Sequence, residues 1–222
     1  MDLSEQHVNV RKATRVLAGY YRRLLHVLAS VERTLEEASS LRLSFLRWDG
    51  IHHENVGRQT TDPVSRWGWD FLPLSWAWFR WTTDGKPHPI GPGSAIVAVQ
   101  HEVDSGYRQD GTEPDPMAFE SPEECRSSLR FWFFALLTGS CSDTWDRVDD
   151  AYEASEEEHW TGVVRDLSIA GLKGTTPGTI MRYAGWTVRM EDLAGNVDVD
   201  RLVLTPLRST LTRALLPEGT TT

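Results

Sequence analysis

The sequence has no long apolar run, almost no cysteine and no excess of basic residues. No apolar stretch approaches the roughly 18 residues that span a bilayer, so we expect no membrane partner. The two cysteines, Cys125 and Cys141, lack the spacing of a zinc site and are expected to be reduced thiols. The net charge of -9 argues against nucleic acid as a main partner, because phosphate binding depends on Lys and Arg.

Several signals of export and catalysis are also missing. The segment Met1 to Glu5 lacks the basic stretch and apolar run of a secretory signal, which leads us to expect a cytoplasmic protein. No Gly-x-Ser-x-Gly elbow occurs. The segment Gly171 to Thr176 places Lys before Gly, the reverse of the order in a phosphate-binding loop. The sequence therefore contains no motif that fixes a reaction.

The first forty residues predict one unusually long helix. From Ser4 to Ser39 there is no proline and the only glycine is Gly19. Apolar residues recur at seven-residue intervals, which places them in a narrow stripe like a coiled-coil seam. The two rows are Val10, Leu17, Leu24, Val31 and Ala38, and Tyr21, Leu28 and Leu35 after Thr14. At about 1.5 Å per residue, the helix would be roughly 50 Å long.

The rest of the chain predicts a sheet with shorter helices. Alternating, aromatic or continuous apolar segments predict strands at 41–48, 69–81, 95–99, 129–137, 179–190 and 200–204. Helices are predicted at 143–160 and from Thr205 to Leu216, and Ser121 to Glu124 is a good helix start. The polar residues from Gln100 to Glu102 are expected to emerge from their strand.

These elements predict an α+β fold, with the long N-terminal helix packed on a mainly antiparallel sheet and one or two further helices. We expect one domain over 1–216, made of the helix at 1–40 and a sheet-rich body at 41–216. Residues 217–222 are expected to form a frayed tail.

The charges of the long helix point to an interface. Five basic residues lie in its N-terminal half, namely Arg11, Lys12, Arg15, Arg22 and Arg23. Glu32, Glu36 and Glu37 lie near the C-terminus, which is the reverse of what the helix dipole favours. Three explanations are open: a second copy pairs antiparallel, the acidic 143–158 segment lies beside the basic half, or water solvates the charges. The predicted interface residues are Arg15, Leu17, Tyr21, Arg22, Leu24, Leu28, Val31 and Leu35.

A group of acidic residues is the main candidate for catalysis. On a helix over 143–160, the side chains of Asp146, Asp149, Asp150 and Glu153 would share one face. Clustered carboxylates can hold Mg²⁺ for phosphate chemistry. The alternative to an ion site is a solvated acidic face. No cofactor is predicted apart from a divalent metal under this hydrolase interpretation.

Two further patterns suggest binding sites. His52 could meet His101 and Glu102 if the loop after the first strand reaches the end of a later strand, and such a group suits a transition metal. Five of the ten tryptophans lie between Trp67 and Trp81. They could form an aromatic platform for a ligand or single-stranded nucleic acid, or they could fill the core.

The leading hypothesis is a non-catalytic protein-protein interaction protein. It would be an accessory or adaptor subunit, or an immunity-type inhibitor, of a bacterial cytoplasmic system, and its partner would be another protein or a second copy. The alternatives are a metal-dependent hydrolase of nucleotides or phosphate esters, and an aromatic-platform binding module.

Overall fold

The protein has an α+β fold, described here from a computed structural model. The structure describes residues 3–50, 76–89, 91–106, 121–141, 165–168 and 175–214. A 35-residue helix, α1 (Leu3–Glu37), precedes a six-stranded sheet, and short helical segments follow it. The strands are β1 (Leu43–Gly50), β2 (Trp76–Thr83), β3 (Ala95–Glu102), β4 (Ser128–Thr138), β5 (Arg165–Ser168) and β6 (Ile180–Arg189). One 3-10 turn, Ser39–Leu41, joins α1 to β1, and another, Met190–Asp192, follows β6. The C-terminal elements are α3 (Asn196–Val199), the π-helical turn η7 (Asp200–Leu204) and α4 (Thr205–Ala214).

The sheet is antiparallel throughout, with the strand order β1-β2-β3-β4-β6-β5. Because strand side chains alternate between faces, the register places a continuous apolar row on the face toward α1. This row runs through Phe79, Val99, Phe131 and Trp186. The rings of Phe131 and Trp186 stack with centroids 4.9 Å apart. The row gives the helix a flat aromatic surface to pack against.

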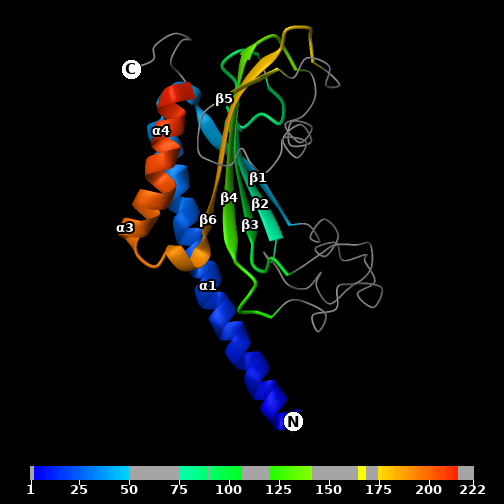
Figure 1. The fold of residues 1–222 in the computed structure, drawn as a ribbon, viewed down its shortest axis with the longest axis vertical. Helices are drawn as coiled ribbons and strands as arrows, with labels where there is room; N and C mark the ends of the chain where they lie inside the picture. Colours follow the sequence, from blue (N-terminus) through cyan, green and yellow to red (C-terminus); the bar gives the residue numbers. More distant parts are fainter. Residues whose placement is uncertain are drawn as a thin grey trace.

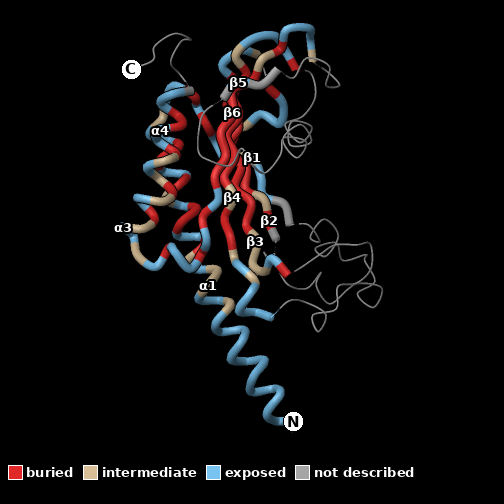
Figure 2. The backbone as a smooth tube through the Cα atoms, in the orientation of Figure 1, coloured by how far each residue is buried: buried red, intermediate tan, exposed pale blue. Residues whose placement is uncertain are grey.

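Only the C-terminal half of α1 packs on this surface. Its fully buried residues repeat at intervals of three and four, so they form one stripe facing the sheet: Leu24, Val27, Leu28, Val31 and Leu35. The segment Met190–Ala214 lies over the same face, and α4 runs alongside α1 (Figure 1). In Figure 2 the colour along α1 changes from exposed to buried part-way along the helix. The helix therefore has an anchored half and a projecting half.

The opposite face of the sheet carries a second, smaller apolar cluster. It consists of Ile96, Ala98, Trp132, Phe134, Met181 and Tyr183, with Trp78 packed against it. The rings of Trp78 and Trp132 stack with centroids 4.1 Å apart, and the guanidinium carbon of Arg80 lies 5.2 Å from the centre of the Trp78 ring. Both faces of the central strands are therefore covered, which explains why β3 and β4 are continuously apolar.

Most strand predictions agree with the structure, and two local predictions are wrong. Residues 200–204 form a π-helical turn, because Val199, Val203 and Leu207 repeat at the spacing of a helix buried on one side. The segment Ser121 to Glu124 forms a turn that leads to β4, in agreement with the strand predicted at 129–137. Gln100 and His101 are both buried, since β3 continues to Glu102: His101 lies beneath α1 and Gln100 lies on the opposite face of the sheet.

Three further predictions lie outside the described residues. They are the helix at 143–160, the loop after the first strand and the tail at 217–222. Within the part of the chain that is described, no helix combines the length and the apolar composition needed to cross a bilayer.

Candidate interaction surface

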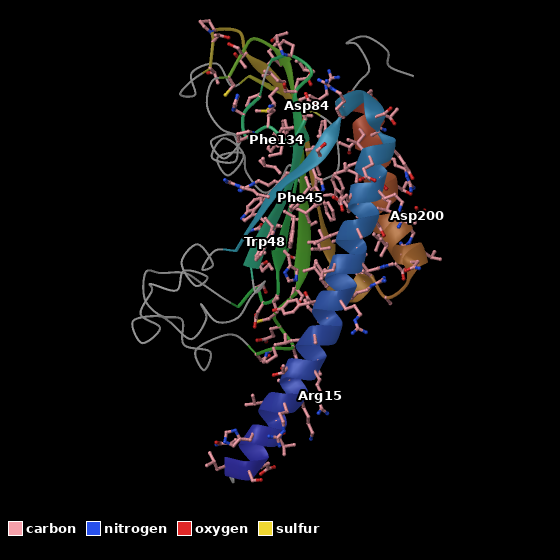
Figure 3. All side chains as sticks on the ribbon, turned by 180° about the vertical axis from the view of Figure 1, so that it is seen from behind. Arg15, Phe45, Trp48, Asp84, Phe134 and Asp200 are labelled. Carbon is pink, nitrogen blue, oxygen red and sulfur yellow. The ribbon has the colours of Figure 1, made fainter. Side chains whose placement is uncertain are left out.

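The first fourteen described residues of α1 are all exposed. From Leu3 to Val16 each side chain is open to solvent, and Leu17 is the first that is half-buried. Val10 is 62% exposed and Val16 is 71% exposed. Figure 1 shows this part of α1 extending past the end of the sheet, and Figure 3 places Arg15 on it. An apolar and basic helix therefore projects from the body.

Two side chains fix α1 where it leaves the body. The hydroxyl of Tyr20 lies 2.8 Å from Nε2 of His101, a fully buried residue of β3. Burial raises the pKa of Tyr20 to about 12, because the phenolate would lose hydration there. Burial also raises the pKa of Tyr21, whose ring packs against that of His101 with centroids 6.5 Å apart. The neutral phenols therefore belong to the packed junction between α1 and β3.

Arg23 holds α1 to the turn that follows β6. Its Nε and one terminal nitrogen donate to the carbonyl oxygen of Leu193 at 3.0 and 2.7 Å, and the same terminal nitrogen donates to Gly195 at 2.9 Å. The turn is itself braced, since the backbone N–H of Gly195 donates to Asp198 at 3.0 Å. That bond, together with Arg201, lowers the pKa of the Asp198 carboxyl. The guanidinium thus joins two separate parts of the chain.

The predicted interface residues divide into two groups. Leu24, Leu28, Val31 and Leu35 are buried in the chain's own core, so they are not exposed for a partner. Arg15 and Arg22 are exposed, and Leu17 and Tyr21 are half-buried. The seven-residue repeat correctly indicated a buried stripe, but the sheet covers its second half.

The structure does not bring the predicted metal ligands together. His101 lies under α1 and bonds to Tyr20, whereas Glu102 belongs to the other face of β3. Glu102 accepts a hydrogen bond from Ser128 at 3.3 Å and forms an ion pair with Arg130 at 3.5 Å. His52 is outside the described residues. Within those residues, no group of three or more His, Cys, Asp or Glu side chains could hold a metal ion.

The acidic cluster proposed for catalysis also lies outside the described residues. It comprises Asp146, Asp149, Asp150 and Glu153, so the hydrolase interpretation stays a prediction. Among the described tryptophans, Trp81, Trp132 and Trp186 are buried, and Trp48 on the edge strand β1 is 45% exposed. The described aromatic residues therefore mainly fill the two sides of the sheet.

A family model accounts for most of the chain, because residues 1–171 match it. The chain belongs to the PM0109 family. The matched PM0109 region contains α1 and the strands from β1 to β5, and it ends before β6 and the C-terminal helices. The family description names no activity. No curated protein and no solved structure matches the chain.

Proposed function

We propose that this protein is a non-catalytic interaction protein that binds its partner through α1. It serves as an accessory or adaptor subunit, or as an immunity-type inhibitor, in a bacterial cytoplasmic system. The observation that carries the proposal is the exposure of every residue from Leu3 to Val16 on a helix whose other half is built into the core.

The anchored half prepares the projecting half for binding. An isolated helix shorter than about 12 to 15 residues is marginal in water, because nucleating its first turn is costly. Here the projecting turns continue from a buried segment held by Leu24, Val31 and Arg23. The projecting turns therefore need no separate nucleation, and α1 loses less conformational entropy on binding a partner because it is formed in advance.

The chemistry of the projecting half suits a protein surface. Arg11, Lys12 and Arg15 give it a basic side, although the net charge of the chain is -9. Val10 and Val16 add exposed apolar area. Apolar contact would supply affinity, and the basic side chains would favour an acidic partner and speed its encounter.

Photo-crosslinking inside cells tests the proposal. A photoreactive amino acid is placed at Val16 or Ala18 of α1, and at Val197 of α3 as a control. Val197 is 78% exposed and Val16 is 71% exposed, so the two valines are similarly accessible but lie on different helices. We expect discrete adducts from at least one α1 position and none from Val197. Absence of adducts at both α1 positions, or the same adducts from Val197, would refute the proposal.

A further inference from the structure

The exposed side of α1 carries a second seven-residue pattern, opposite the buried stripe. Its residues are separated alternately by four and three positions, so they form a continuous seam along one helix face. They are Arg11, Arg15, Ala18, Arg22, Leu25, Ala29, Glu32 and Glu36, and all are exposed. We call these eight residues the outer seam. Because all eight residues are exposed, neither the sheet nor α4 covers this face of α1.

The outer seam has opposite charges at its two ends, and between them it carries two alanines that flank Arg22 and Leu25. Arg11 and Arg15 lie at one end, and Glu32 and Glu36 lie at the other. Ala18 and Ala29 lie at equal distances from the midpoint of the seam. Among the described residues, none of the four charged side chains forms an ion pair within the chain. The seam is therefore complementary to itself when one copy is reversed.

We propose that the partner of the outer seam is a second copy of this chain, with the two α1 helices antiparallel. Arg11 then faces Glu36 of the partner subunit, and Arg15 faces Glu32 of the partner subunit. Ala18 lies opposite Ala29 of the partner subunit, and Arg22 packs its aliphatic part on Leu25 of the partner subunit. This inference rests on the proposed function and names the partner for one face of α1.

Three physical arguments support this register. Each pairing lies symmetrically about the midpoint between Arg23 and Leu24, as a two-fold axis requires. The opposed alanines allow the helices to reach the short end of the usual separation of about 8 to 10 Å. The basic residues near the positive end of one dipole lie beside the acidic residues of the other helix, which offsets the unfavourable charge order.

The two bodies do not compete for space in this arrangement. The sheet packs against Leu24, Leu28 and Val31, on the side of α1 opposite the outer seam. Each body therefore lies on the far side of its own helix from the two-fold axis. Because exposed ion pairs are weak and easily screened, the dimer is expected to dissociate on dilution and at high salt.

Charge exchange between purified variants tests the pairing. Light scattering or sedimentation of the wild-type chain should show a dimer at low ionic strength, with twice the 25.1 kDa monomer mass. R11E/R15E and E32R/E36R should each weaken dimerisation by at least about tenfold, because they place like charges opposite each other. An equimolar mixture of the two variants should form a heterodimer, and the combined fourfold variant should dimerise again.

A matched control separates the seam from total charge. R201E/R208E makes the same charge change as R11E/R15E at exposed residues of η7 and α4, and it should leave dimerisation unchanged.

Crosslinking between introduced cysteines tests the register of the two helices. In a mixture of the A18C and A29C variants, a short bismaleimide should crosslink the two chains to a greater extent than it crosslinks wild-type chains through their native thiols. A18C alone should not be crosslinked in this way, because its two copies would be about 16 Å apart along the helices.

The outcomes distinguish this inference from the proposed function. A wild-type chain that stays monomeric at low salt, or a mixture of swapped variants that stays monomeric, overturns the self-pairing. If α1 then still gives adducts with another protein in cells, the proposed function stands with a different partner. If no α1 position gives adducts, both proposals fail.

Discussion

The hydroxyl of Tyr20 lies 2.8 Å from Nε2 of His101, and this contact joins the middle of α1 to the end of β3. It marks the boundary between the two halves of the helix, because the side chains before Leu17 are exposed and those from Leu24 onward include the buried stripe. His101 is fully buried there, although it lies near the end of its strand. The junction therefore fixes the direction in which the projecting half leaves the body.

Stability should fall at alkaline pH because of Tyr20. Burial raises its pKa from 10.0 to about 12, so the folded state holds the proton more tightly than the unfolded state does. The stabilising effect is complete below pH of about 10 and is lost between about 10 and about 12. We expect the free energy of unfolding to fall by about 1 to 2 kcal/mol over this range. This is less than a shift of two full pKa units would give, because part of the Tyr20 side chain remains solvated.

Urea unfolding of the wild type and of Y20F across this pH range measures the effect. Y20F keeps the ring but cannot ionise, so its free energy of unfolding should fall less steeply with pH. Parallel pH profiles for the two proteins would show that Tyr20 is not the group responsible.

Arg22 and Arg23 should have different roles although they are neighbours. R23A removes three strong hydrogen bonds to the carbonyls of Leu193 and Gly195 and should lower the free energy of unfolding by about 1.5 to 3 kcal/mol. R22A should change it by less than about 0.5 kcal/mol, since Arg22 is exposed. Chemical denaturation of both variants measures this difference. Equal losses would contradict the assignment of Arg23 as the anchor.

Two valines of α1 offer a comparison of its halves. Val31 is fully buried and Val16 is 71% exposed. V31A should destabilise the fold by about 2 kcal/mol through lost burial and a small cavity. V16A should be near neutral, because the side chain buries little area and alanine has the higher helix propensity. Thermal or urea unfolding gives both values, and a comparable loss in V16A would mean that the projecting half is packed in solution.

Gly139 and Gly178 test the close approach of two loops at the end of β4. Both glycines have positive φ, 75° and 76°, so alanine is strained at either position. A Cβ at Gly139 would also lie 2.3 Å from the hydroxyl oxygen of Thr179, whereas nothing lies within 4 Å at Gly178. G139A should therefore cost at least about 1 kcal/mol more than G178A in denaturant unfolding. Equal costs would show that the loops can separate.

Regular spacing made the main elements predictable. The stripe through Leu24 and Val31 predicts a helix buried on one side, and the alternation from Leu41 to Trp48 predicts the first strand. Spacing shows that a face is covered but not what covers it. The same stripe therefore suggested a partner chain, whereas the structure places its second half against β2, β3 and β4.

The remaining errors arise from contacts between distant parts of the chain. The apolar run Leu202 to Leu204 is short enough to fit a strand or a helix, and only the packing of Val203 against the core decides between them. Gln100 and His101 have polar side chains, which led us to expect exposure. Tyr20, 81 positions earlier than His101, supplies the hydrogen bond that makes its burial favourable. Arg23 gave no local signal, because its acceptors are backbone carbonyls far away in the sequence.

The place of β6 in the sheet has a consequence for synthesis. Because β6 lies between β4 and β5, the order of the strands in space differs from the order in which a ribosome produces them. Until Arg189 has left the exit tunnel, β4 has an open edge lined with aromatic residues such as Phe131 and Phe133. Such an edge can pair with other nascent chains. The growing polypeptide is therefore most vulnerable to aggregation just before β6 emerges.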